Sequence, residues 1–139
     1  EVGVAKRIAA VGGTPMLLRE RDEMAELLQT GKTLAEHVYE WGSFEDMHLT
    51  LVEALGNQLL VHMYGRLMDR ISRIRNFYGD RFTRRRLEDI VSEHAAILDA
   101  IVCGDVQTAE RMMARHLQNA RSFLGRLTEQ ETGVESWSM

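Results

Sequence analysis

After Pro15 the sequence contains no further proline, and this feature limits the fold more than any other. Proline interrupts helices, so its absence over the remaining residues permits long helices. Ala, Leu, Met, Arg and Glu, which have high helix propensity, are frequent in the same stretch. No segment alternates apolar and polar residues for long enough to predict a sheet. The sequence therefore predicts an all-α protein.

Glycines and helix-capping residues divide the chain into blocks of helix length. Gly12, Gly56 and Gly104 are expected to end helices, and Asn57 and Asp105 are expected to cap the helices that follow. The expected helices cover residues 5–11, 14–31, 33–56, 57–78, 83–104 and 105–129. Short turns between them favour an antiparallel helical bundle of about six helices. We expect residues 1–129 to form this single domain and residues 130–139 to form a polar tail.

The composition excludes several classes of protein. Hydrophobic residues make up 45% and charged residues 27% of the chain, a balance typical of folded domains and not of disordered ones. The net charge of -4 gives the chain no electrostatic attraction for nucleic acid, and the basic run at residues 81–86 is expected to be a solvated helix end. The single cysteine, Cys103, excludes an internal disulfide. Because no apolar run approaches the ~20 residues that cross a bilayer, we expect a cytoplasmic protein without a membrane partner.

Three of the five histidines, His48, His94 and His116, lie within apolar stripes of the expected helices. Counted from the expected turns at one end of the bundle, they lie eight, ten and eleven residues away. At ~1.5 Å per residue these depths are ~12, ~15 and ~16 Å. The three imidazoles are therefore expected at one level of the bundle.

Three imidazoles in an apolar interior are costly to bury, and a divalent metal ion resolves this because each neutral ring can donate a lone pair. We therefore predict a metal site formed by His48, His94 and His116. Glu45 stands three residues before His48, on a nearby helix face, and is the candidate fourth ligand. The alternatives are a solvated carboxylate at Glu45 and hydrogen-bonded core histidines that bind no metal.

Short motifs over most of the chain resemble those of a known family. They are EH at 93–94, GD at 104–105, HL at 116–117 and, upstream, His48 followed by GN at 56–57. Their spacing is similar to that of the C-terminal ligand-binding (FCD) domain of GntR-type bacterial transcription regulators of the FadR subfamily. The resemblance extends from about residue 5 to residue 127.

This resemblance implies an antiparallel bundle with a central cavity for a ligand and a metal. In metal-binding members an aspartate and three histidines hold a divalent transition metal, often zinc, nickel or manganese, and small carboxylate metabolites bind beside or on it. The histidines carry over to His48, His94 and His116, but the position of the aspartate, four residues before the first histidine, is Phe44 here. Either Glu45 takes its place, or three histidines and water suffice, or the metal is weak or absent.

The resemblance also implies partners. Members of the family usually form dimers and carry a winged helix-turn-helix domain before this one, which this chain lacks. We therefore expect a homodimer that belongs to a longer regulator and that contacts DNA only through the missing N-terminal domain.

A polar group is expected to hold the carboxylate of a small-acid ligand. The candidates are Arg66 and Arg70, on the fourth expected helix, and Asn119, one turn after His116. Arg66 lies ~13 Å from the start of its helix, near the level of the histidines. The simpler alternative is that the arginine stems cover the core while their heads stay in water, and that Asn119 is a surface amide.

We predict a sensor domain and not an enzyme. Glu45 and His48 form an E-x-x-H motif, but the second copy that di-iron bundles require is missing, as are phosphate-binding loops and nucleophile elbows. The enzymatic alternative is a mononuclear metal-dependent hydrolase with Glu45 as its general base. The third interpretation is a metal-free helical dimerisation module.

Overall fold

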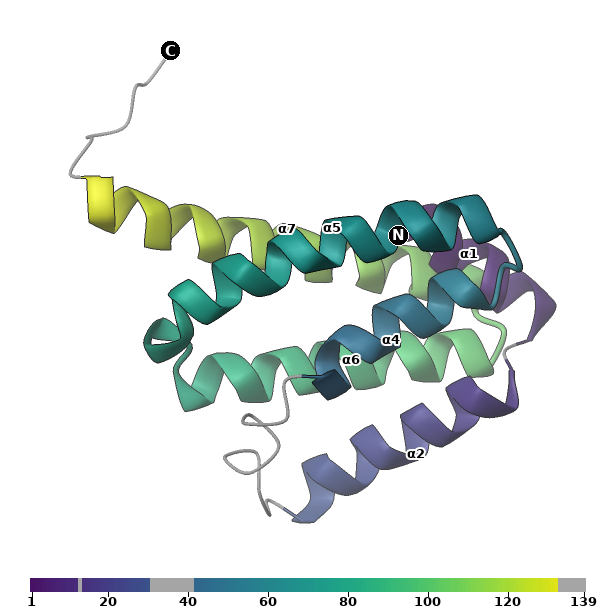
Figure 1. Cartoon of the computed structure of the whole chain (residues 1–139). Coiled ribbons are helices and arrows are strands. Elements are labelled where there is room, and N and C mark those ends of the chain that lie inside the picture. The colour runs from purple at the N-terminus through teal and green to yellow at the C-terminus, as the bar shows by residue number, and fades with distance from the viewer. Residues whose placement is uncertain (13, 31–41, 133–139) are drawn as a thin grey trace.

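The computed structural model describes residues 1–12, 14–30 and 42–132, and these form six α-helices and one short 3-10 helix (Figure 1). The elements are α1 (Val2–Val11), α2 (Pro15–Thr30), α4 (Gly42–Glu53), α5 (Gln58–Phe77), η1 (Gly79–Arg81), α6 (Arg84–Val102) and α7 (Val106–Thr132). The described residues contain no strand, so the all-α prediction is confirmed.

Three of the expected helices differ from the structure by three residues or more at an end. The first helix begins at Val2, three residues before its expected start at residue 5. The first part of the helix expected at 33–56 lies outside the described residues, and its described part is α4. The last helix continues to Thr132, past the expected end at residue 129. No glycine or proline lies between these two points, and the next glycine in the sequence is Gly133.

The predicted helix boundaries depend on local hydrogen bonds. Side-chain oxygens of Thr14, Asn57 and Asp105 accept hydrogen bonds from the backbone N–H groups three residues later, at 3.3, 3.2 and 3.0 Å. Each therefore satisfies a donor at the start of its helix. Gly56 and Gly104 follow helices with φ angles of 69° and 73°, the left-handed conformation that glycine adopts without strain. The turn at Gly104 reverses the chain between α6 and α7.

The α6–α7 pair forms the centre of the bundle. α1 packs mainly against α7, and α2 packs mainly against α6. α5 packs against α4 (Figure 1). Ile97 and Ile101 of α6 and Ala109 and Met113 of α7 are fully buried, and Ile8 of α1 belongs to the same core. Full burial of an aliphatic side chain stabilises a fold by about 1.5–3 kcal/mol. The two central helices thus give firm support to the side chains that they direct inward.

Replacing Gly104 by alanine is expected to lower the free energy of unfolding by about 1 kcal/mol, because its φ of 73° is disfavoured for L side chains. The added Cβ would lie 3.7 Å from the carbonyl oxygen of Ala9, an ordinary contact, so the effect comes from the backbone alone. Gly125→Ala, within α7 and with no atom within 4 Å of its added Cβ, should instead stabilise by about 0.5–1 kcal/mol. Urea unfolding measures both, and shifts of equal sign would contradict this account.

Candidate metal centre

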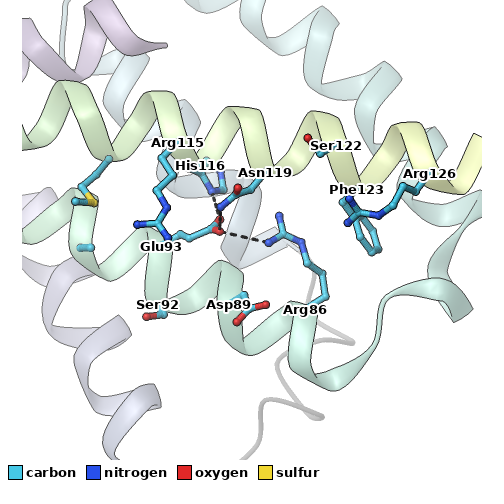
Figure 2. A pocket seen from close by; sticks show the side chains of 12 residues that line it. Arg86, Asp89, Ser92, Glu93, Arg115, His116, Asn119, Ser122, Phe123 and Arg126 are labelled. Carbon is cyan, nitrogen blue, oxygen red and sulfur yellow. Dashed lines mark hydrogen bonds and ion pairs between the residues drawn. The ribbon is translucent and has the colours of Figure 1, made fainter. Parts of the chain in front are cut away.

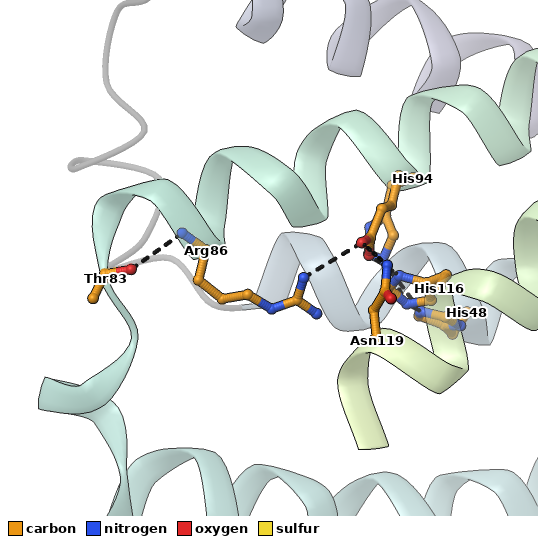
Figure 3. Close-up of polar contacts among 7 residues, drawn as sticks. His48, Thr83, Arg86, His94, His116 and Asn119 are labelled. Carbon is orange, nitrogen blue, oxygen red and sulfur yellow. Dashed lines mark hydrogen bonds and ion pairs between the residues drawn. The ribbon is translucent and has the colours of Figure 1, made fainter. Parts of the chain in front are cut away.

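His48 of α4, His94 of α6 and His116 of α7 meet inside the bundle (Figure 3). Their exposed fractions are 5%, 2% and 5%. The Nε2 atoms of His48 and His94 are 3.3 Å apart, those of His94 and His116 3.3 Å, and those of His48 and His116 3.2 Å. The convergence that the helix depths predicted is therefore confirmed.

Two carboxylates contact the outer edges of two of these rings. Glu93 Oε2 lies 2.7 Å from His116 Nδ1 (Figure 2), and Glu1 Oε2 lies 3.2 Å from His48 Nδ1. The first contact is a hydrogen bond, whereas the second is an ion-pair distance without good hydrogen-bond alignment. An ionised carboxylate only accepts, so each contact favours the tautomer with the proton on Nδ1. In the neutral rings of His48 and His116, Nε2 then presents a lone pair to the cluster.

Both carboxyl groups are held in the ionised form. Burial by itself raises the pKa of Glu1, but the contact with His48 and a 2.5 Å hydrogen bond from the Tyr64 hydroxyl outweigh it and set this pKa at about 2. Burial also acts against ionisation of Glu93, whose pKa is nevertheless lowered by hydrogen bonds from Asn119 and His116. The two negative charges therefore persist at neutral pH.

Two of the histidines resist protonation. Burial, and after it the charges of His48 and His116, push the pKa of His94 well below its usual value of 6.5. Burial and the charge of His48 also lower the pKa of His116, although Glu93 opposes this. The structure thus favours neutral rings with lone pairs available.

The three Nε2 atoms fit a divalent transition metal ion. The lone pairs of His48 and His116 face each other at 3.2 Å, and an N–H on His94 can satisfy only one of them. Nitrogen ligands at ~2.0–2.1 Å from a tetrahedral metal lie roughly 3.3–3.4 Å from one another. The observed separations of 3.2–3.3 Å are close to this value.

The other predicted site residues have different positions. Glu45 lies in α4, but its side chain, like that of Phe44, is outside the described part of the structure. Arg66 and Arg70 are exposed and line a hollow formed by α5 residues alone, away from the inward face of α5. Asn119 does lie beside the cluster, where it donates a 2.7 Å hydrogen bond to Glu93 Oε1.

Several residues that contact the cluster or its carboxylates were not predicted from the sequence. Glu1 and Glu93 carry the two carboxylates described above. Arg86, expected in a solvated run, has a side chain only 12% exposed and places Nη1 3.4 Å from Glu93 Oε1 (Figure 2). On α5, the charge of Arg75 contributes to lowering the pKa of His94. Helical spacing could have indicated both, since Arg86 precedes Glu93 by seven residues and Arg75 follows the buried Met68 by seven.

The comparison with known families adds to this geometry. The model of the FCD domain matches residues 2–119, a range that contains all three histidines. This chain belongs to the FCD domain family. FCD domains are regulatory domains, consistent with the C-terminal effector-binding part of GntR-type regulators, so the resemblance noted from the motifs is confirmed at the level of the family.

Two further comparisons give no relatives of this FCD domain. No curated protein and no solved structure matches it. In the described part of the chain, no helix has the length and apolar character needed to cross a membrane.

Metal-free protein is expected to lose stability as the pH falls from about 7.5 to 5. The folded state keeps His94 and His116 neutral, whereas the unfolded chain protonates them below their usual pKa of 6.5. The unfolded state therefore binds more protons in this window, and the free energy of unfolding decreases by at most about 1.4 kcal/mol per pH unit for each proton. Urea unfolding at a series of pH values measures the slope.

The control for this pH dependence is His62, an exposed histidine of α5. His62→Gln should leave the slope unchanged, and His94→Gln should reduce it. A metal-free protein whose stability is constant across the window would contradict the account.

Proposed function

We propose that this FCD domain is the effector-binding and dimerisation domain of a transcription regulator of the FadR subfamily, and that it senses a small organic acid at a divalent-metal site formed by His48, His94 and His116. The observation that carries the proposal is the triangle of Nε2 atoms at 3.2–3.3 Å in a buried setting. This spacing suits nitrogen ligands around one divalent transition metal ion, with zinc, nickel and manganese as the candidates.

The residues around the cluster have separate tasks in this proposal. When bound, the metal supplies a Lewis-acidic position that three protein ligands leave open for a carboxylate. Glu93 and Glu1 orient His116 and His48 through their Nδ1 edges and balance the positive charge. Asn119 fixes the second oxygen of Glu93.

The acid would act as a regulator by binding two arrangements of the dimer with different affinity. Such a difference shifts the balance between the arrangements and thereby changes DNA binding in the intact protein. Among the described residues a hydrolase finds little support, because the two carboxylates beside the cluster, Glu93 and Glu1, contact the Nδ1 edges of His116 and His48. A general base would instead need to reach water on the Nε2 side. The side chain of Glu45, the candidate base from the sequence, lies outside the described part of the structure.

Wild-type protein after extensive dialysis is expected to retain about one transition-metal ion per chain, measured by inductively coupled plasma mass spectrometry. His94→Ala should lose this metal, because one of three ligands is removed. Glu93→Gln should weaken zinc affinity by about 10–100-fold in a competition titration with a chelating dye, because the carboxylate that orients His116 is lost.

Two exposed residues provide matched controls for the metal experiments. His62→Ala removes an α5 histidine outside the cluster, and Glu88→Gln removes an exposed α6 carboxylate that pairs with Arg84. Both should bind metal like wild type. A wild-type protein that is free of metal and takes up neither zinc nor nickel would exclude the metal site.

The homodimer is part of the same proposal, and α5 offers a surface for it. Leu59, Met63 and Leu67 are 69%, 60% and 48% exposed and follow one another at intervals of four residues, so they form one apolar stripe on this helix. Arg66 and Arg70 lie beside the stripe, and we assign them to this interface rather than to the acid. Exposed apolar stripes of this kind are typical of surfaces that bind another protein.

Met63→Glu is expected to weaken dimerisation by about tenfold or more, because it places a charge at the centre of the apolar stripe. Sedimentation velocity over a range of protein concentrations measures the change. Met16→Glu, at a methionine of α2 that is 54% exposed, is the matched control and should dimerise like wild type. Equal effects of both substitutions would exclude the α5 interface.

A further inference from the structure

A groove of about 520 Å³ follows the seam between α6 and α7 (Figure 2). Its lining includes His116 and, beside it, Glu93, which contacts the Nδ1 edge of this ring. The Nε2 atom of His116 faces the other two histidines instead. Glu93 therefore separates the groove from the lone pairs of the cluster, and a ligand in the groove would occupy a second site.

More positively charged than negatively charged side chains line the groove. Arg86, Arg115 and Arg126 line it, and the carboxylates in its lining are Asp89 and Glu93. Glu93 is already bound by His116 and Asn119 on the inner side. Within the described part of the chain, Arg115 and Arg126 form no ion pair. Two guanidinium groups are thus available at the mouth of the groove.

Arg86 adds a preoriented guanidinium group at the floor. Its side chain is 12% exposed, and the central carbon of its guanidinium group lies 5.4 Å from the centroid of the Phe123 ring, a cation–π contact that helps to hold the group in place. Its contact with Glu93 is long, at 3.4 Å, and its Nε is buried without a hydrogen-bond partner. A buried donor of this kind is costly unless an acceptor reaches it. An oxyanion in the groove would supply that acceptor.

We infer that the groove between α6 and α7 binds a small molecule through a carboxylate or phosphate group, which is held by Arg86, Arg115 and Arg126. Planar guanidinium groups match both oxyanions because they donate two parallel hydrogen bonds. The hydroxyl groups of Ser92 and Ser122, in the same lining, offer further hydrogen bonds to the body of the ligand.

The groove is also coupled to the histidine cluster, and this part of the inference rests on the proposed metal site. Arg86 contacts Glu93, and Glu93 contacts His116. An anion that binds Arg86 weakens the contact between Arg86 and Glu93. The carboxylate of Glu93 then accepts a stronger hydrogen bond from His116. The negative charge of the anion acts in the same direction, so anion and metal each strengthen the binding of the other.

The test uses inorganic sulfate as the probe and metal-free protein at constant ionic strength, with chloride as the replaced ion. Nuclear magnetic resonance of backbone amides and arginine Nε–H groups should show saturable shifts for Arg86 and its neighbours. The double variant Arg115→Gln/Arg126→Gln should bind sulfate about tenfold more weakly, because two charge-assisted contacts are removed. Arg121→Gln, an exposed arginine of α7 outside the groove lining, is the control and should behave like wild type.

Shifts that rise linearly without saturation, or that are equal in the double variant and wild type, would overturn the groove site and leave only nonspecific attraction of the ion. The coupling is tested by repeating the sulfate titration with zinc-loaded protein, where the dissociation constant should decrease at least twofold. An unchanged constant would overturn the coupling. Failure of zinc to bind would contradict the proposed metal site. The titration of metal-free protein would still show whether the groove binds an anion.

Discussion

The lone pairs of buried imidazoles constrain this FCD domain more than any other interaction. His48, His94 and His116 place three Nε2 atoms within 3.2–3.3 Å of one another in a buried part of the bundle. A proton can relieve only one pair of facing nitrogens, and burial makes protonation of His94 unfavourable by lowering its pKa. Lone pairs therefore face one another where α4, α6 and α7 meet. A cation that accepts three nitrogen ligands would relieve this repulsion.

Two ionised carboxylates beside the cluster would also favour a cation there. Glu1 and Glu93 stay ionised although both are partly buried. His48 and Tyr64 stabilise the charge of Glu1. Asn119 and His116 stabilise that of Glu93. Their contacts on the Nδ1 edges turn the Nε2 lone pairs inward. They also place two negative charges next to the cluster, in a chain that has Phe44 at the position where the family resemblance implies an aspartate. Charge balance from outside the ring of ligands is thus available here without that aspartate.

Several features of the fold and site could be predicted from the sequence because they depend on local chemistry. Thr14, Asn57 and Asp105 cap helices as their side-chain oxygens require, and Gly56 and Gly104 end helices where a left-handed residue is needed. Once those turns are known, the rise per residue of a helix fixes the depth of each histidine. The meeting of three histidines from distant segments was therefore predictable from spacing alone.

The sequence by itself determined the helices, their reversals and the level of the three histidines, because capping, helix period and rise are properties of short segments. Only the tertiary structure decided which charged side chains reach the cluster. Arg86 and Arg66 look alike in the sequence, yet Arg86 packs over Phe123 beside Glu93 while Arg66 is exposed on α5. The carboxylate of Glu1 reaches His48, 47 positions later in the chain, only because α1 packs beside α4. Helical spacing places Arg86 on the same face of α6 as Glu93, but whether such a side chain reaches the cluster depends on how the helices rotate and pack against one another.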